Sequence, residues 1–183
     1  INAFHMDEYI GVLPDAPQSF GNFLRIRIFD KVPFKNVYYL NGHATDLEEE
    51  CTRYTSLLSQ FPTDIVCLGI GENGHIAFND PDVANFNDHK LVKIVKLDHV
   101  CRQQQVNEKC FETLEQVPTE ALTLTIPALL KAKWMFCIVP FKNKSQAVYR
   151  TIHGDISEKC PASILRRKEK SSLYLDTESA QLL

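Results

Sequence analysis

The sequence lacks the signals of a secreted, membrane-spanning or zinc-binding protein. It has no apolar run of the roughly 18 residues that a transmembrane helix needs, and residues 1–7 lack the basic start and apolar core of a signal peptide. Its six cysteines form no CxxC pair and its six histidines no HExxH or HxxxH spacing, which argues against a disulfide framework and a zinc site. We therefore expect a cytoplasmic protein with reduced thiols, no metal and no membrane partner.

An excess of positive charge is also absent. Lys and Arg number 20 against 23 Asp and Glu, for a net charge of -3, so the molecule as a whole has no attraction for nucleic acid. The 183 residues, 44% of them hydrophobic, suit one domain with a sizeable core. Because the chain begins with Ile1 on what reads as the end of a strand, we expect a fragment of a longer domain.

Strand-like and helix-like patterns alternate along the chain. A capping-box spacing at Thr45–Glu48, followed by apolar residues at steps of four and three as far as Phe61, predicts a helix. The continuous apolar run Ile65–Ile70 predicts a strand buried on both faces. Further strands are expected at residues 2–6, 37–40, 91–97, 121–126, 134–139 and 173–175, and further helices at residues 20–28, 98–111 and 143–152.

This alternation predicts an α/β fold, a three-layer sandwich around a largely parallel, Rossmann-like central sheet whose amino-terminal part is missing. In such sheets ligands bind beyond the carboxyl ends of the strands. Residues that follow a strand are therefore the candidates for chemistry.

The first candidates are the adjacent carboxylates of Asp7 and Glu8, which follow an apolar strand. Neighbouring acids raise each other's pKa, which can leave one of them able to move a proton. A solvated strand-to-loop turn accounts for the same pattern, so both interpretations stay open on spacing alone.

The second candidates lie in the glycine-rich segment after residues 65–70. Gly69, Gly71 and Gly74 match the dinucleotide pattern GxGxxG. The match is weak because Asn79–Asp82 interrupts the chain before any amphipathic helix can follow. We instead interpret the glycines as allowing close approach of the backbone to a ligand.

His75 lies in the same segment. A histidine titrates near neutral pH and can both accept and donate a proton. Asp80 would orient the ring and stabilise its charged form, and Asn73 would hydrogen-bond to the pair. The alternative is a histidine that only satisfies backbone groups of the loop.

The third candidate is Lys144, which lies between an apolar strand and a helix. Helix N-termini attract anions, and Lys144 adds a full positive charge there, so a phosphate site is predicted. A solvated lysine is the alternative. Arg102 is a further candidate ligand for a phosphate or hydroxyl group.

Together these segments resemble the glucosamine-6-phosphate deaminase/isomerase family, whose fold is shared with 6-phosphogluconolactonases. The family's Asn-Met/Leu-Asp-Glu-Tyr motif is matched by His5–Tyr9, and its Gly-Asx-Gly-His-Ile-x-Phe-Asn-Glu-Pro loop by Glu72–Pro81. Lys144 falls where the family has a phosphate-binding lysine. The resemblance covers essentially the whole chain, and residues 1–183 are expected to form a single domain without the family's amino-terminal strand and phosphate loop.

The resemblance implies an aldose-ketose isomerisation with loss of ammonia, from a hexosamine 6-phosphate to fructose 6-phosphate or a related ketose phosphate. Asp7 would move a proton between C2 and C1 of the open-chain sugar, and His75, supported by Asp80 and Asn73, would assist ring opening. The partner is a small-molecule sugar phosphate, no metal or organic cofactor is implied, and homo-oligomerisation is left open. The predicted substrate-binding residues are Lys144, Arg102, Glu8, Gly71 and Gly74.

The sequence departs from the family pattern at three places. Asn73 stands where many members have aspartate, and Asp80 replaces the usual glutamate. The arginine of an Asn-x-Arg-Phe-Phe segment is absent from residues 106–111, where Arg102 is the candidate to substitute. Two other functions stay open: a lactonase that uses His75 to activate water, and a non-catalytic sugar-phosphate sensor.

Overall fold

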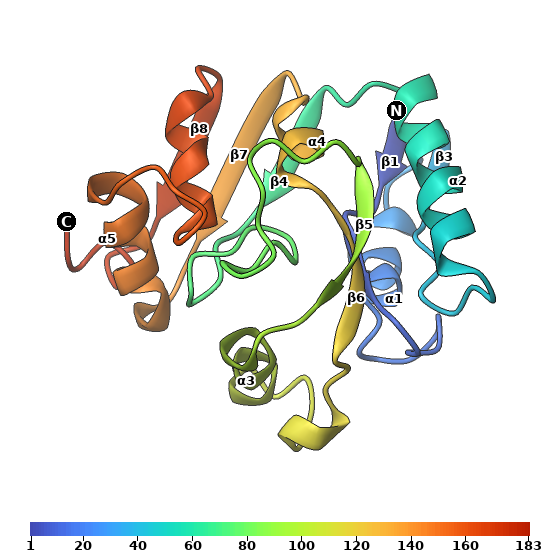
Figure 1. The fold of residues 1–183 in the computed structure, drawn as a ribbon, viewed down its shortest axis with the longest axis horizontal. Coiled ribbons are helices and arrows are strands. Elements are labelled where there is room, and N and C mark those ends of the chain that lie inside the picture. Colours follow the sequence, from blue (N-terminus) through green and yellow to red (C-terminus); the bar gives the residue numbers. More distant parts are fainter.

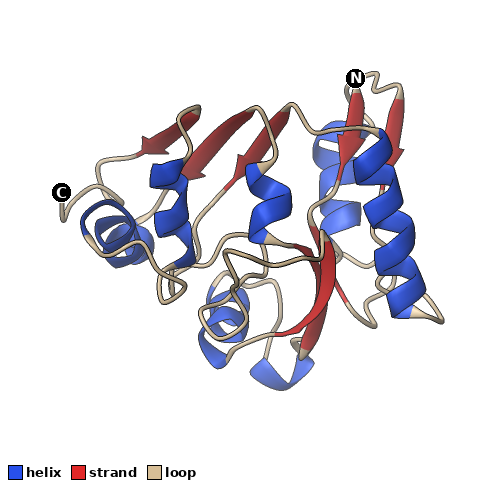
Figure 2. Ribbon diagram, turned by 45° about the horizontal axis from the view of Figure 1, so that its top comes forward, coloured by secondary structure: helices blue, strands red, loops and turns tan.

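Two of the three sheets are built from parallel strands, as the alternating pattern predicts. The structure is a computed structural model that describes residues 1–183 (Figures 1 and 2). Strand β1 (Asn2–Phe4) pairs with β3 (Asn36–Tyr38), and β7 (Trp134–Val139) lies between β4 (Ile65–Leu68) and β8 (Ser171–Leu175). The α/β class with parallel sheets is confirmed.

The third sheet is antiparallel, which differs from the expectation. It contains β2 (Asp7–Tyr9), β6 (Glu120–Leu124) and β5 (Val92–Lys96), in that order. The chain bends after β1, and the carbonyl oxygen of Met6 accepts a hydrogen bond of 2.9 Å from the backbone N–H of Leu124. Asp7 therefore begins a strand paired with β6 and does not lie in a solvated turn, so the turn interpretation is wrong.

The longest helix, α2 (Leu47–Gln60), begins where capping chemistry predicts. Its N-cap is Asp46, which accepts a hydrogen bond of 3.0 Å from Glu49 N. Tyr54 on this helix is fully buried, and its hydroxyl donates to the carbonyl oxygens of His5 and Tyr38 at 2.7 and 2.9 Å. Helix α2 is thereby fixed against β1 and β3.

The other helical segments are shorter. The predicted helix at residues 20–28 is split into α1 and a π-helical turn, and Phe23 and Ile28 on its expected apolar face are exposed. The helix expected at 98–111 ends at Asn107, and the one expected at 143–152 begins with a 3₁₀ turn. Their bounds are α1 (Phe20–Leu24), η1 (Arg25–Phe29), α3 (His99–Asn107), η2 (Leu114–Gln116), α4 (Ile126–Leu130), η3 (Lys142–Lys144), α5 (Ser145–His153) and η4 (Pro161–Arg167).

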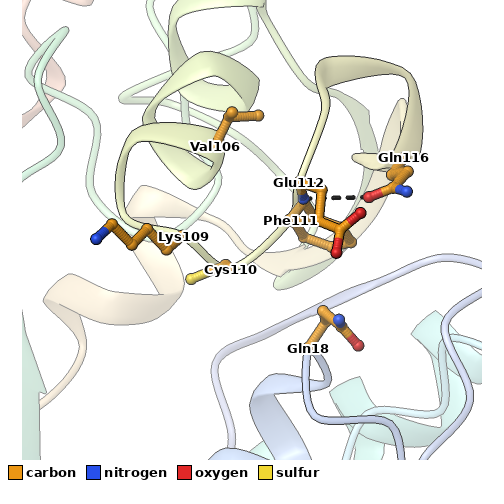
Figure 3. A pocket seen from close by; sticks show the side chains of 7 residues that line it. All are labelled: Gln18, Val106, Lys109, Cys110, Phe111, Glu112 and Gln116. Atoms are coloured by element: carbon orange, nitrogen blue, oxygen red, sulfur yellow. Dashed lines mark hydrogen bonds between the residues drawn. The ribbon is translucent and has the colours of Figure 1, made fainter.

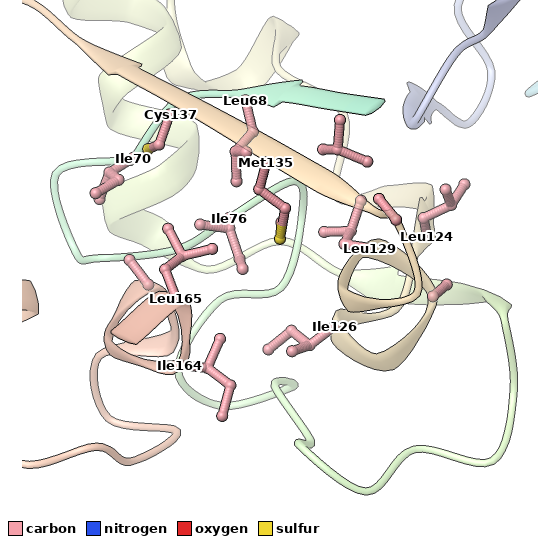
Figure 4. Close-up of a cluster of buried hydrophobic side chains, with 14 of the residues drawn as sticks. Leu68, Ile70, Ile76, Leu124, Ile126, Leu129, Met135, Cys137, Ile164 and Leu165 are labelled. Carbon is pink, nitrogen blue, oxygen red and sulfur yellow. The ribbon is translucent and has the colours of Figure 1, made fainter. Parts of the chain in front are cut away.

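The β4–β7–β8 sheet is covered on one face only. On its inner face Met135 and Cys137 are fully buried, and they pack in a core cluster of 23 residues that includes Ile76 and Leu165 (Figure 4). On the outer face Ile65, Trp134, Ile138 and Tyr174 are all exposed, Ile65 to 56%. The prediction of a strand buried on both faces is therefore wrong, and within residues 1–183 no third layer covers this sheet.

None of the helices is both long and apolar enough to cross a membrane.

Candidate active site

The glycine-rich loop after β4 is held rigidly on both sides of His75. Ile76 and Phe78 are buried, and the side-chain amide of Asn79 donates to the carbonyl oxygens of Ile76 and Leu124 at 3.0 and 2.9 Å. Gly74 adopts φ +94°, a left-handed conformation that favours glycine. The loop therefore places the His75 side chain in a fixed position.

The His75 ring is oriented by two oxygen acceptors. Its Nδ1 lies 2.8 Å from Asn73 Oδ1 and 2.9 Å from Asp80 Oδ1. The amide nitrogen of Asn73 donates to Asp80 and Asp98, at 2.9 and 2.8 Å, so its oxygen faces the ring. Nδ1 therefore carries the proton, and Nε2, which makes no hydrogen bond within the protein, is left as a base.

Asp80 is the centre of this hydrogen-bond network. Besides His75 and Asn73, it accepts a hydrogen bond from the backbone N–H of Asp98 at 3.3 Å, and the Cys101 thiol lies within 4.8 Å of it. Burial alone would raise the pKa of Asp80, but the hydrogen bonds and the charge of His75 lower it below its usual range. Asp80 stays ionised and can stabilise a charged His75.

Asp98 and Cys101 are site residues that the sequence did not reveal. Asp98 is the N-cap of α3, where its Oδ1 accepts 2.6 Å from Cys101 N. Its position before a helix indicated an N-cap, but no sequence pattern indicated its contact with Asn73. Burial and the nearby carboxylates of Asp80 and Asp98 raise the pKa of the Cys101 thiol, which stays protonated.

The donor atoms of His75, Asp80 and Cys101 all lie within 4.8 Å of one another. Nitrogen, oxygen and sulfur donors at this spacing suit a transition metal. Hydrogen bonds already account for the close approach, because Asp80 contacts the His75 ring directly and Asp98, which donates to Asp80, also caps Cys101 N. We therefore interpret the group as a proton-handling network.

Asp7 lies beside this network. It pairs with Thr123 of β6, whose hydroxyl accepts 3.1 Å from Phe78 N in the glycine-rich loop. Burial, and next the charge of Glu8, raise the pKa of Asp7 to about 7. Its charge also contributes to the raised pKa of Cys101, as that of Asp80 does. The hydrogen bond between Thr123 and Phe78 thus connects the sheet that contains Asp7 to the loop that contains His75.

Glu8 has a structural role and not the predicted one. Its carboxylate accepts four hydrogen bonds, from the Ser19 hydroxyl at 2.7 Å and from the backbone N–H groups of Tyr9, Phe20 and Gly21 at 2.9, 3.2 and 2.9 Å. Each oxygen accepts two of them, which leaves no free acceptor for substrate. Glu8 fixes the start of α1 instead.

Lys144 is buried, which removes the interpretation of a solvated lysine. Only 6% of its surface is exposed, and its Nζ lies 3.2 Å from Oε1 of Glu108. Arg102, in contrast, donates to the carbonyl oxygens of Leu114 and Val117 at 2.6 and 2.9 Å. Arg102 thus ties α3 to η2 through its Nε and Nη2 atoms, and its binding of substrate stays a prediction.

Gly71 and Gly74 make room for neighbouring groups. A Cβ at Gly71 would overlap the His75 ring, and a Cβ at Gly74 would lie 2.8 Å from Cys160 Sγ. Gly71 therefore lets the ring lie directly against the loop backbone. Neither glycine is shown to touch a ligand, and their contact with substrate stays a prediction.

A hollow of about 850 Å³ lies near the end of α3 (Figure 3). Asp7, His75 and Lys144 are not among its lining residues, and the only hydrogen bond between its side chains and backbone joins Glu112 N to Gln116 Oε1, at 3.1 Å. None of the predicted site residues lines it. The lining residues are Gln18, Val106, Lys109, Cys110, Phe111, Glu112 and Gln116.

Comparison with known proteins places this geometry in context. Residues 1–174 match the family model described as glucosamine-6-phosphate isomerases/6-phosphogluconolactonase. The glucosamine-6-phosphate deaminase of Bacillus cereus strain B4264 is 40% identical over 182 residues, which cover 100% of this chain and 68% of the relative. The one from Listeria innocua serovar 6a is 38% identical over 183 residues, 100% of this chain and 76% of the relative.

Solved structures of other proteins share the fold of this chain. A monomeric glucosamine-6-phosphate deaminase superimposes with a TM-score of 0.91 at 34% identity and covers 100% of this chain and 75% of its own. A 6-phosphogluconolactonase from Thermotoga maritima, 21% identical with a TM-score of 0.71, covers 94% of this chain and 70% of its own. The second likeness shows the shared fold alone.

Proposed function

Because this chain belongs to the family of glucosamine-6-phosphate isomerases and 6-phosphogluconolactonases, we propose on the evidence of its site that it is a glucosamine-6-phosphate deaminase. It converts a hexosamine 6-phosphate and water into a ketose phosphate and ammonia. The observation that carries this function is the pairing of Asp7, whose pKa is raised to about 7, with the His75–Asn73–Asp80 network beside it. The reaction needs two groups that move protons, and both are present.

Asp7 is the base for the carbon acid. Its ionised carboxylate removes the C2 proton of the open-chain sugar and returns it at C1, while the C1 oxygen gains the proton that the C2 amine loses. The resulting C2 imine is hydrolysed by water to the ketone and ammonia. A pKa near 7 lets one carboxyl group take and give back a proton at neutral pH.

His75 opens the sugar ring. Its free Nε2 accepts the proton of the C1 hydroxyl, and the resulting imidazolium protonates the ring oxygen as the ring bond breaks. Ionised Asp80 stabilises that imidazolium, and Asn73 fixes the tautomer. Lys144 binds the phosphate.

The site favours this reaction over lactone hydrolysis. A lactonase would use His75 to activate water and would not need Asp7 as a base. The test is to incubate the protein with a panel of hexosamine 6-phosphates and with 6-phosphogluconolactone while following ammonia and acid release. Ammonia release from a hexosamine 6-phosphate is expected, and lactone hydrolysis without any ammonia release would overturn the proposal.

We also propose that residues 1–183 act as a single sugar-phosphate domain in the cytoplasm. One core cluster extends from Leu40 to Leu165, which supports a single unit. The deaminase with a TM-score of 0.91 is described as monomeric, so catalysis in this chain is proposed to need no second subunit.

The activity is expected to rise with pH through about 7. The pKa of Asp7 is raised by burial and by Glu8, so Asp7 is still protonated between pH 4 and 7, where an ordinary aspartate is ionised. Because the base must be ionised, kcat/KM should increase up to about pH 7. The measurement is a pH-rate profile. Phosphate binding is titrated over the same pH range, so that ionisation of the substrate phosphate can be distinguished from ionisation of Asp7. A rate already constant at pH 5 would contradict the role of Asp7.

Alanine at Gly71 is expected to lower turnover about 100-fold, because the added Cβ pushes the His75 ring out of place. Gly69→Ala is the matched control, since its Cβ would meet only the Ile138 carbonyl oxygen at 3.4 Å. Both variants are compared by turnover and melting temperature. Equal activity of the two alanine variants would show that the ring does not depend on Gly71.

A further inference from the structure

The ammonium group of Lys144 and the side-chain amide of Gln104, both buried, contact the same carboxylate, that of Glu108. Glu108 Oε1 lies 3.2 Å from Lys144 Nζ and accepts a hydrogen bond of 2.8 Å from Gln104 Nε2. Lys144 and Gln104 are each 6% exposed, whereas the Glu108 side chain is 40% exposed. Two buried donors thus converge on one oxygen that reaches them from the surface.

The side-chain amide of Gln104 is oriented independently of Glu108. Gln104 Oε1 accepts 3.0 Å from the backbone N–H of Glu72, which turns the amide nitrogen of Gln104 toward Glu108. The Glu72 carboxylate accepts 2.7 Å from the side chain of Asn143, the residue before Lys144. The glycine-rich loop therefore orients the amide of Gln104, and the Asn143–Glu72 hydrogen bond holds η3, which carries Lys144, against the same loop.

We propose that the Glu108 carboxylate marks the position of the substrate phosphate, and that Gln104 and Lys144 are the donors that bind the phosphate once it displaces Glu108. This inference rests on the proposed function, because it takes a sugar phosphate as the ligand. It also supplies a second phosphate donor in addition to Lys144, whereas Nε and Nη2 of Arg102 bind carbonyl oxygens near η2.

Electrostatics explain why Glu108 is there. A buried ammonium is costly without a partner, and Glu108 supplies the opposite charge in the unliganded site. A phosphate carries more charge than one carboxylate and offers more acceptor oxygens. Phosphate therefore displaces the Glu108 carboxylate from both donors, whereas an anion of lower charge competes less well with Glu108.

Glu108 can leave without disturbing the helix. It is the C-cap of α3, and Lys109 after it has a left-handed φ of +61°, so α3 ends there. Rotation about its side-chain bonds takes the carboxylate into solvent. Glu108 is thus a specificity-determining residue that sets how tightly an anion must bind.

The experiment titrates the protein with inorganic phosphate by calorimetry. Glu108→Gln should bind phosphate about threefold to tenfold more tightly, as expected when one partly exposed ionic competitor is removed. Glu169→Gln changes the net charge equally, at an exposed residue without an ion pair, and should bind as the parent does. No gain of Glu108→Gln over Glu169→Gln would overturn the proposal.

Two further variants test the donors. In a Lys144→Met background the gain from Glu108→Gln should be smaller, because only the competition at Gln104 remains, and an undiminished gain would show that Glu108 does not compete at Lys144. Gln104→Glu keeps an acceptor for Glu72 N but replaces the donor by a carboxylate, so phosphate binding should weaken at least tenfold. Unchanged binding would remove Gln104 from the site. Ammonia release by the parent protein is measured separately, so failure of the proposed function and failure of the phosphate assignment can be told apart.

Discussion

Asp7→Asn is expected to lower turnover by about two to four orders of magnitude, the cost of losing one positioned base. Asparagine keeps the size of the side chain and removes the carboxylate that accepts the C2 proton. Binding of inorganic phosphate should stay unchanged, because Lys144 and Gln104 are untouched. The measurement is kcat for ammonia release from the hexosamine 6-phosphate.

The stability of Asp7→Asn provides the control. The folded protein raises the pKa of Asp7 from 3.8 to about 7, so ionisation of Asp7 destabilises the fold. That destabilisation is absent below about pH 4 and complete above about pH 7. Asparagine does not ionise, so the variant should melt at an equal or higher temperature than the parent at pH 8. A lower melting temperature would attribute lost activity to unfolding.

His75→Gln is expected to cost a similar two to four orders of magnitude with the cyclic substrate. Glutamine can still hydrogen-bond to Asp80, but it cannot take and return a proton. An open-chain substrate analogue bypasses ring opening, so its turnover should fall much less. The comparison of the two substrates is the measurement.

Asp80→Asn is the matched control for this second variant. It removes the charge that stabilises the imidazolium and replaces one acceptor oxygen by a donor, but it keeps an oxygen for the His75 ring, so it should reproduce the preference for the open-chain analogue with a smaller loss. An equal loss on both substrates in His75→Gln would show that the histidine acts after ring opening.

Local sequence patterns predicted where helices and strands lie better than they predicted the burial and the pairing of those elements. The helix after Asp46 and the strand at 134–139 follow from capping and apolar patterns within a few residues. The apolar run at Ile65 shows no periodicity, so it could not reveal that alternate side chains are exposed. The antiparallel pairing of β2 with β6 joins residues more than a hundred positions apart in sequence, and no local pattern carries that information.

The site residues likewise divide into those that a local sequence pattern predicted and those that it did not. His75, Asn73 and Asp80 lie within eight consecutive residues, so the loop pattern predicted their contacts. The contributions of α3 come from tertiary packing, which explains why Cys101 and Gln104 were missed. Two charged residues were harder to predict for another reason, because other parts of the chain already bind their hydrogen-bonding groups.

Glu8 and Arg102 are these two residues. Both look available in the sequence, but four donors at the start of α1 occupy both carboxylate oxygens of Glu8, and carbonyl oxygens near η2 occupy Nε and Nη2 of Arg102. A charged residue near a site is a ligand candidate only when its hydrogen-bonding groups are free.

The most direct test of the account is exchange of the substrate C2 proton with deuterated solvent, followed by NMR in the parent and in Asp7→Asn. The parent should exchange this proton during turnover, His75→Gln should still exchange it in an open-chain substrate analogue, and Asp7→Asn should exchange it at least about a hundredfold more slowly. If Asp7→Asn exchanges the C2 proton as fast as the parent, Asp7 is not the base and the proposed chemistry of this site is wrong.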